Sequence, residues 1–341
     1  MKFSVAREAL LDVLAAAETI TGSKTNFSIL SNILIEAKSG KLIISASNND
    51  ITMYAEIIAK IEKKGSVTVL EKILAGIIRE LPADDILFEL TETSMIQIKS
   101  LSPKIRGAYE IIGIPKDDFP AIHAFPEDAA CLIFDKLQFK KMIKKTIFAV
   151  SADNLKYTLN GVYFEKNGNT VKMIGIDGRR LAHIEKEMKS SDLPDFNVII
   201  PQQILSELLK TINGEGPLKF VFHENRLFFK FDNFVFTSTV VSGKFPNYSL
   251  FIPKESKFSF TAINSELISA IKRVAVLVDL ESHRVKFHLE KNALQISAQN
   301  AELGNASTEI FLEFSGEPAD LGFSYQYLIE ILREIETEEV I

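Results

Sequence analysis

Three stretches of the chain alternate apolar and polar residues with a period of two around a central turn signal. They cover residues 33–48, 161–177 and 285–300, with turns at Ser39-Gly40, Asn167-Gly168 and Lys291-Asn292. Alternation around such a turn predicts a β-hairpin in each stretch. Because the hairpin recurs at long intervals, the sequence predicts one structural unit repeated along the chain.

Apolar residues also recur at helical spacing in six segments, two for each hairpin. The segments cover about residues 7–20, 72–81, 136–150, 201–212, 265–278 and 325–335. In the second of them, the apolar residues that fall on one helix face are Ile73, Leu74, Ile77 and Ile78. Asn264 and Ser265 are expected to cap the fifth helix, and Asn213-Gly214 to end the fourth.

The segments between the helices are strand-like. A phenylalanine-rich stretch at residues 220–238 predicts a meander with turns at Glu224-Asn225 and Asp232-Asn233. Helices beside antiparallel strands define an α+β module. The expected fold is therefore α+β, with three tandem modules at residues 1–125, 126–253 and 254–341, each of two helices packed on antiparallel sheet. Compared with the second module, the third is expected to lack roughly 25–30 residues at its C-terminal side.

Composition adds little against this picture. The chain has 46% hydrophobic and 25% charged residues, as in ordinary soluble globular proteins. No apolar run approaches the ~20 residues of a membrane helix, and no signal peptide is expected. The single cysteine, Cys131, excludes an intrachain disulfide and suits a reducing cytoplasm. The net charge of −6 argues only weakly against nucleic acid, because salt screens charges beyond ~8 Å and local patches decide.

Catalytic chemistry has no clear sequence signal. The chain contains no nucleophile elbow, no P-loop and no dinucleotide-binding glycine fingerprint. The five histidines lack metal-ligand spacing, so neither a metal nor a cofactor is expected. A repeat enzyme of an unrelated type stays open as an alternative, and the lack of a clustered acid–base set argues against it.

The segment at residues 136–150 carries the strongest charge pattern. Its apolar face holds Phe139, Met142, Ile143, Thr146, Ile147 and Val150, and the opposite face holds Lys140, Lys141, Lys144 and Lys145. Such a face is most often a solvated surface. Cations at related places on the other helices favour a second interpretation; they are Lys72, Arg79, Lys210, Lys272 and Arg273. If the modules close into a ring with helices inside, these cations would bind DNA phosphates without reading bases.

Several motifs occur in an order and spacing that is typical of one family. They are Met1-Lys2-Phe3-Ser4-Val5, residues 28–34, Tyr-Thr-Leu-Asn-Gly at 157–161, Ile-Asp-Gly-Arg-Arg-Leu-Ala at 176–182 and Gly-Lys-Phe-Pro-Asn-Tyr at 243–248. In these motifs the chain resembles the bacterial DNA polymerase III beta subunit, the sliding clamp. The resemblance covers essentially the whole chain.

The resemblance implies a DNA-clamp fold and a ring made by a head-to-tail homodimer around duplex DNA. A heterologous contact that closes after two subunits is a legitimate ring geometry. Tyr109 and Ile111 of one copy would meet Val276 and Leu277 of the other. From the pattern alone, all four residues would be interpreted as sheet or helix core, and only for Leu277 are core and interface equally compatible with the sequence.

The resemblance also implies a hydrophobic cleft that receives short linear peptides of partner proteins. The matching positions are Leu159, Ile176, Gly178, Arg179, Arg180, Leu181, Pro246, Leu250 and Phe251. An apolar pocket with a few polar groups suits an extended peptide. Ile176 and Leu250 stand where the family often has threonine and arginine, so we expect a more hydrophobic cleft than is usual in the family. Without the resemblance, Asp177-Gly178 would be interpreted as a simple turn.

Matching positions further imply DNA contacts at Lys24, Lys72, Arg79, Lys156 and Tyr157. Tyr157 could stack on a base of single-stranded template, or it could be a strand-edge aromatic. Asp153 stands where a neutral polar contact is expected, and Gln202 and Gln203 occupy a stretch that is often basic in the family.

The expected function is that of a non-catalytic, cytoplasmic processivity factor of a DNA polymerase holoenzyme. Its expected partners are double-stranded DNA without sequence specificity, a second copy of the chain, the replicative polymerase alpha subunit, the clamp loader, and repair proteins that carry clamp-binding motifs. No membrane and no cofactor are expected. The alternative within the same family is a truncated or paralogous clamp that acts only as a protein-interaction module without encircling DNA.

Overall fold

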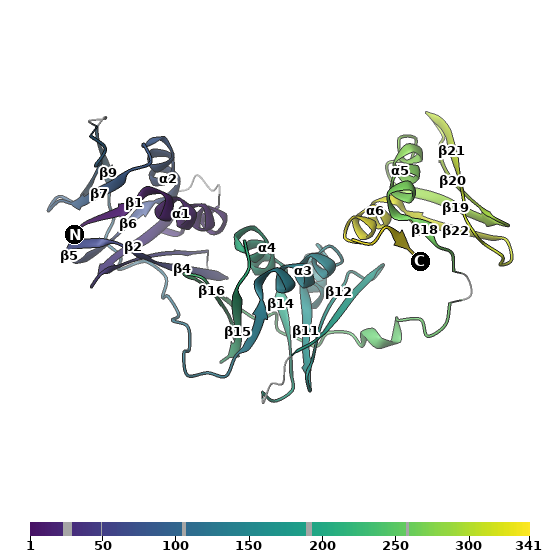
Figure 1. Ribbon diagram of the computed structural model, residues 1–341, viewed down its shortest axis with the longest axis horizontal. Helices are drawn as coiled ribbons and strands as arrows, with labels where there is room; N and C mark the ends of the chain where they lie inside the picture. Colours follow the sequence, from purple (N-terminus) through teal and green to yellow (C-terminus); the bar gives the residue numbers. More distant parts are fainter. Residues whose placement is uncertain (23–28, 49, 104–106, 189–192, 257–258) are drawn as a thin grey trace. The chain divides into compact units, whose positions relative to one another are not determined.

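The computed structural model describes residues 1–22, 29–48, 50–103, 107–188, 193–256 and 259–341. The chain forms two compact units. The first comprises Met1–Ile143, Ala152–Met173 and Glu185–Lys244, and the second comprises Lys144–Ser151, Ile174–Ile184 and Phe245–Ile341. Both contain helices beside antiparallel sheet (Figure 1), which confirms the predicted α+β class.

Within the described residues, six α-helices form at the places that the apolar spacing predicts. They are α1 (Arg7–Thr21), α2 (Glu71–Glu80), α3 (Lys136–Ile147), α4 (Gln202–Thr211), α5 (Asn264–Ala275) and α6 (Tyr325–Arg333). Each buries one face; α2 buries Leu74, Ala75 and Ile78 and exposes Lys72. The predicted end of α4 is confirmed, because Gly214 adopts φ +64°, a left-handed conformation that glycine accepts at little cost.

The predicted cap of α5 is wrong. The helix begins at Asn264 itself, and no side chain caps its N-terminus. The Nδ2 of Asn264 donates instead to the carbonyl oxygens of Leu332 and Ile335, at 3.0 and 3.2 Å. These carbonyls lie at the C-terminus of α6, where backbone acceptors lack partners inside the helix. Asn264 therefore joins the two helices of the third module.

The first module contains two antiparallel sheets with α1 and α2 side by side (Figure 1). One sheet has five strands, in the order β5 (Lys60–Lys63), β1 (Lys2–Ala6), β7 (Asp85–Leu90), β8 (Met95–Ser100) and β9 (Ala108–Ile112). The other contains β4 (Ile51–Ile58), β3 (Lys41–Ser47), β2 (Asn32–Lys38) and β6 (Gly65–Leu70). A short 3₁₀ turn, η1 (Ile29–Ser31), precedes β2.

The second sheet of the first module continues into the second module. Four further strands extend it, in the order β10 (Leu132–Asp135), β15 (Pro217–His223), β16 (Arg226–Phe231) and β17 (Phe234–Thr239), with β17 antiparallel to β4. Phe236 of β17 lies opposite Met53 of β4, and both side chains are fully buried. Backbone hydrogen bonds therefore cross the joint between the first two modules.

The phenylalanine-rich meander forms as predicted and supplies much of the second module's core. The rings of Phe164 and Phe229 lie 4.9 and 5.0 Å from the ring of Phe220, and Phe134 packs at 4.9 Å from Phe139 of α3. Ring contacts at these distances add to the free energy gained by burying apolar area. The core thus ties the meander to the apolar face of α3.

A four-stranded sheet completes the second module, in the order β13 (Leu181–Glu187), β12 (Thr170–Ile176), β11 (Gly161–Asn167) and β14 (Phe196–Pro201). Gly175 of β12 admits close packing of α3, because a Cβ there would lie 2.2 Å from the Thr146 carbonyl oxygen. The predicted hairpin turn is present, with Gly168 at φ +56°.

The second unit contains all described residues of the third module. Its sheet has the order β21 (Gly304–Phe311), β20 (Ala293–Asn300), β19 (Arg284–Glu290) and β22 (Ala319–Ser324). A short pair is formed by β18 (Ala262–Ile263) and β23 (Glu339–Val340). The helices α5 and α6 lie side by side (Figure 1), and Ile271, Val285 and Leu294 belong to the core between helices and sheet.

The segment that joins the first two modules is anchored to the eight-stranded sheet by one buried side chain. Phe125 is 6% exposed and inserts among Val221, Phe228 and Val235 of the eight-stranded sheet. Its ring meets that of Phe228 edge-on at 6.3 Å, and its backbone N–H donates to the Tyr54 hydroxyl at 3.2 Å. Phe125 is therefore part of the first unit's core, whereas its neighbours Ala124, Glu127 and Asp128 are exposed.

The segment between the second and third modules is different. It contains the short η3 (Tyr248–Leu250), and every residue from 249 to 256 is exposed. Among its apolar side chains, Leu250 is 77% and Phe251 64% exposed. Large apolar side chains left in water are the usual mark of a binding surface when they lie together.

Candidate functional site

The helix α3 has the two faces that the sequence predicts. Phe139, Met142 and Ile143 are buried, whereas Lys141 and Lys144 are exposed. Lys140 is half-buried, and its Nζ donates to the Ile212 carbonyl oxygen at 2.5 Å. A cation at this place satisfies a backbone acceptor at the end of α4 and complements the helix dipole. Lys140 thus already has a structural partner, and Lys144 extends into solvent.

The cations of the other helices differ in how far they are engaged. Lys72 and Lys272 are exposed. Arg79 is ion-paired with Glu18 of α1, and Lys210 pairs with Glu207 at 3.2 Å. Arg273 donates to hydroxyl oxygens of Ser269 and Thr308 at 2.9 and 3.3 Å. Lys24 lies outside the described residues. Exposed ion pairs contribute little free energy, so these cations remain available to exchange partners.

A buried carboxyl lies at the start of α2. Glu71 is 2% exposed, and its Oε1 has no hydrogen-bond partner within the described part of the chain. The pKa of Glu71 is raised from its ordinary value of 4.5 to about 7, chiefly by burial and also by the negative charge of Glu18, while Arg79 acts in the opposite direction. Glu71 therefore titrates near neutral pH, which the sequence did not predict.

Lys156 and Tyr157 lie on η2 (Asn154–Leu159), which Asp153 caps by accepting from the Leu155 N–H at 2.9 Å. Both side chains are exposed, Tyr157 to 59%. Gly243 packs against this element with φ +119°, and a Cβ there would lie 3.2 Å from the Tyr157 ring. The motif that begins at Tyr157 and the motif that begins at Gly243 therefore meet. The exposed ring is accessible for stacking.

The cleft positions at 176–181 form a tight turn between β12 and β13. The Oδ1 of Asp177 accepts from the backbone N–H groups of Arg179 and Arg180 at 2.8 and 3.0 Å. Gly178 has φ +92°, which a side chain would disfavour. This is the Asx-type turn chemistry that the sequence left open as an interpretation.

Apolar cleft residues fall into two groups by exposure. Ile176 is 5% and Leu159 9% exposed, so both belong mostly to the core. Leu181 and Pro246 are half-buried, and Leu250 and Phe251 are largely exposed. In the second unit, the turn at 177–180 offers polar groups, and Leu250 and Phe251 offer exposed apolar groups; peptide sites use both kinds.

Arg180 is the most engaged cleft residue. Its Nε donates to Asp177 Oδ2 at 3.0 Å, its Nη1 to the Glu330 carboxylate, and its Nη2 to the Phe148 carbonyl oxygen. The guanidinium carbon lies 4.2 Å from the centre of the Tyr327 ring. Sequence reasoning placed Arg180 in the cleft and missed Tyr327, Glu330 and Phe148, because no local pattern links a turn to a helix about 150 residues later.

The predicted interface residues lie on exposed parts of each unit. Tyr109 and Ile111 belong to β9, the last strand of the five-stranded sheet, and Tyr109 is 40% exposed. Val276, directly after α5, is 77% exposed, and Leu277 is half-buried. None of the four is fully buried, which disfavours the interpretation that they are core.

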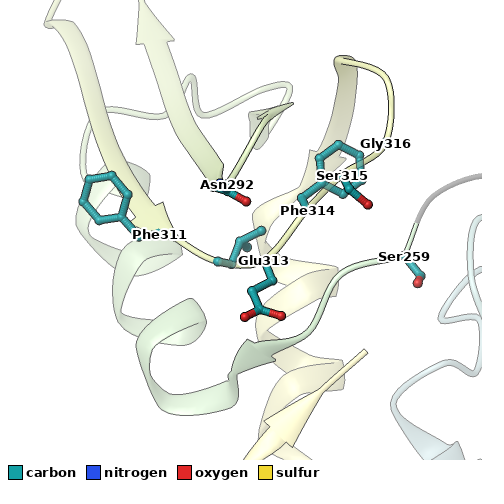
Figure 2. Close-up of a pocket in the computed structure, with 8 residues that line it drawn as sticks. Ser259, Asn292, Phe311, Glu313, Phe314, Ser315 and Gly316 are labelled. Atoms are coloured by element: carbon teal, nitrogen blue, oxygen red, sulfur yellow. The ribbon is translucent and has the colours of Figure 1, made fainter.

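Other features of the described residues point to no reaction. They contain no group of three His, Cys, Asp or Glu side chains placed to hold a metal ion, and none of their helices has the length and hydropathy to cross a membrane. A hollow of about 950 Å³ lies where β21 ends (Figure 2). Its lining includes Phe311 and Phe314, and Glu313 is the one titratable side chain among its described lining.

Taken together, three tandem α+β modules with cations along their helices and exposed apolar sheet edges define a clamp-type scaffold protein. Comparison with known families agrees in each part of the chain. The DNA polymerase III beta subunit N-terminal domain matches residues 1–123, the central domain residues 134–247, and the C-terminal domain residues 250–341.

Individual relatives match over the whole chain. A beta sliding clamp of Treponema pallidum is 30% identical over 346 residues, which cover 100% of this chain and 92% of the relative. The DNA polymerase III subunit beta of Pseudomonas aeruginosa has a similar structure, with a TM-score of 0.92, 26% identity, and coverage of 99% of this chain and 92% of that chain. A Pseudomonas aeruginosa sliding clamp bound to griselimycin matches with a TM-score of 0.91 and 26% identity, over 99% of this chain and 91% of that chain.

The chain belongs to the DNA polymerase III beta subunit family, the beta sliding clamps, whose members are non-catalytic processivity subunits.

Proposed function

We propose that two copies of this chain close head to tail into a ring around duplex DNA and tether a replicative polymerase to it. The proposal is carried by the match of all three domain families in order along the chain, together with the structural similarity to a DNA polymerase III subunit beta over 99% of the chain. The three modules of each copy divide at residues 125/126 and 253/254. The ring acts in the cytoplasm, where its DNA substrate lies.

Ring closure joins the β9 edge of one copy to the third module of the other. Tyr109 and Ile111 on one side and Val276 and Leu277 on the other supply the apolar contact. The partial exposure of these side chains in one chain supports this assignment, since isolated edge strands expose unpaired backbone groups that a second strand can pair.

DNA binds to cations along the helices and η2, without sequence specificity. The residues proposed for this role are Lys24, Lys72, Arg79, Lys140, Lys144, Lys156, Tyr157, Lys210, Lys272 and Arg273. Cations that bind phosphates but no base edges allow the ring to move along the duplex. The exposure of Lys72, Lys144 and Lys272 supports their part in it.

Partner proteins bind the cleft through short extended peptides. The proposed partners are the polymerase alpha subunit, the clamp loader and repair proteins that carry such motifs. Exposed Leu250 and Phe251 supply anchors, and the Gly178 turn supplies backbone groups. Griselimycin, which is bound to the clamp of Pseudomonas aeruginosa, is proposed to bind the same residues here.

A topological experiment tests the ring. In a Cys131→Ala background, Tyr109→Cys and Leu277→Cys are introduced together, the protein is mixed with nicked circular plasmid, and the cysteines are cross-linked. A closed ring stays on the circle in 1 M salt and is lost when the plasmid is cut, because only topology resists high salt. The matched control carries Tyr109→Cys alone.

Two results would contradict the proposal. Cross-linked protein that leaves circular and linear DNA equally would show that no ring encloses the duplex. Failure of the cysteines to cross-link, with griselimycin still bound, would favour the alternative of an interaction module that does not encircle DNA.

A further inference from the structure

We propose that Arg180 is a positioning residue that couples the peptide-binding turn at 177–180 to helix α6 of the third module. The inference rests on the proposed cleft and deepens it, since it assigns to one cleft residue a role other than contact with a peptide. The juxtaposition that carries it lies wholly within the second unit, which contains both the turn and α6.

The guanidinium uses every one of its nitrogens. The Nε bonds Asp177 within the turn, the Nη1 bonds Glu330 on α6, and the Nη2 bonds the backbone carbonyl of Phe148 after α3. One planar group therefore joins three segments that are far apart in the sequence. Arginine suits this task, because its donors form a rigid fork that lysine cannot reproduce.

The surroundings of Arg180 hold its side chain in place. The side chain of Arg180 is 12% exposed, and that of Asp177 is 13% exposed. The guanidinium carbon lies 4.2 Å above the Tyr327 ring and 5.4 Å from the Phe148 ring, so aromatic faces cover the charge. Ion pairs and cation–π contacts gain strength as water is excluded. Three of the five N–H donors of Arg180 are therefore engaged within the chain, and the 12% exposure of the side chain leaves little of the guanidinium open to a peptide.

Asp177 connects the Arg180 guanidinium to the backbone of the turn. While its Oδ2 holds Arg180 Nε, its Oδ1 accepts the N–H groups of Arg179 and Arg180. A ligand that reshapes or stiffens this turn must therefore shift the carboxylate that orients the guanidinium. Because the same guanidinium holds Glu330 and Tyr327, the change reaches α6. Coupling between two sites requires a physical element that both sites influence. The Arg180 guanidinium is such an element, because it contacts both the turn and α6.

The test is amide hydrogen exchange of the full chain with and without griselimycin, in the wild type and in Arg180→Lys. Arg333→Lys is the matched control, since Arg333 is an exposed arginine on the same helix. Tyr327→Leu is a second variant that removes only the aromatic cover. Exchange of β19 and β20, which lie in the same unit as the substituted residues, reports whether that unit is folded in each variant.

Without ligand, α6 amides should exchange about tenfold faster in Arg180→Lys, as expected for the loss of a charge-assisted hydrogen bond, and at the wild-type rate in Arg333→Lys. With griselimycin, both the turn and α6 should be protected in the wild type, and only the turn in Arg180→Lys. Tyr327→Leu should show the same separation to a smaller extent.

Each contrary result has a distinct meaning. Wild-type exchange of α6 in both Arg180→Lys and Tyr327→Leu would overturn the positioning role. Protection of the turn without protection of α6 in the wild type would overturn the coupling and leave the proposed cleft intact. Protection of neither by griselimycin would overturn the cleft itself, and the coupling with it.

Discussion

The two segments that join the modules are built in contrasting ways. Between the first two modules, β17 pairs with β4 in a continuous sheet, and Phe125 of the connecting segment is buried against that sheet. Between the second and third modules, residues 249–256 are exposed, and the contact that stands out is the single side chain of Arg180 with α6. The first joint thus includes a continuous sheet and a buried ring, and the second includes the hydrogen bond and ring contact that Arg180 makes with α6.

The contrast teaches where each joint is vulnerable. A joint made of several ladder hydrogen bonds and buried rings spreads its free energy over many groups, and it weakens only when the core is damaged. At the second joint, one guanidinium makes several of the contacts at once, so a small change of its chemistry should loosen them together. The first joint suits permanent structure, and the second suits adjustment when a partner binds.

The largest effect is expected from Phe125→Ala. Truncation of this buried ring should lower the free energy of unfolding of the first unit by about 3–5 kcal/mol, because it leaves a cavity among Val221, Phe228 and Val235. Denaturant unfolding followed by tyrosine fluorescence measures the change. Phe251→Ala is the matched control in the other segment; its ring is 64% exposed, and its loss should change stability by less than about 0.5 kcal/mol. Equal losses of stability in Phe125→Ala and Phe251→Ala would contradict the proposed difference between the two joining segments.

Glu71→Gln should change how the stability of the first unit depends on pH. The folded pKa of Glu71, about 7, lies above its ordinary value of 4.5, so the buried neutral form is favoured at low pH. Wild-type stability should therefore fall as pH rises from about 4.5 to 7, by roughly 3 kcal/mol at most, and level off above that. In Glu71→Gln this fall should be absent. Parallel curves of stability against pH for the two proteins, measured between pH 4 and pH 8, would show that Glu71 is not the group that titrates.

A smaller effect is expected at the second joint from Tyr327→Leu. Removal of the ring over Arg180 should cost about 1 kcal/mol, the size of a partly covered cation–π contact. Tyr327→Phe keeps the ring and should behave as the wild type. Native-state hydrogen exchange of amides in the second unit measures the change in its free energy of unfolding. If Tyr327→Phe is as damaging as Tyr327→Leu, the hydroxyl rather than the ring carries the contact.

The smallest effect concerns Lys144, which lies where α3 passes from the first unit to the second. Lys144→Ala should leave stability unchanged and reduce by about 1 the slope of log affinity for duplex DNA against log salt concentration. Lys64→Ala, an exposed lysine between β5 and β6, is the control and should keep the wild-type slope. Titration of a fluorescent duplex at several salt concentrations decides between them, and an unchanged slope in Lys144→Ala would remove Lys144 from the DNA-binding face.

Much of the fold follows from local patterns in the sequence. Alternation around Ser39-Gly40, Asn167-Gly168 and Lys291-Asn292 predicts the three hairpins, and helical spacing predicts the six helices, because both signals come from residues close in the chain. The cap at Asn264 failed for the opposite reason. Its side chain bonds the end of α6, and a partner about 70 residues away leaves no trace in local sequence.

The candidate site was predictable in a similar measure. The turn at Gly178 and the lysine face of α3 could be predicted from residue types and spacing. The roles of Arg180 and Lys140 could not, since both depend on carbonyl or carboxylate partners that only the tertiary fold brings near. The raised pKa of Glu71 was likewise hidden, because burial of a carboxyl at a helix start depends on how α1 packs against α2.

The measurement that tests the central claim most directly is the native mass of the chain in solution, determined by light scattering at micromolar concentration. The account predicts twice the mass of one chain, because the proposed ring joins β9 of one copy to the third module of the other, and it predicts a single-chain mass for Ile111→Asp, which places a charge in that proposed contact. A single-chain mass for the unaltered protein would contradict the ring.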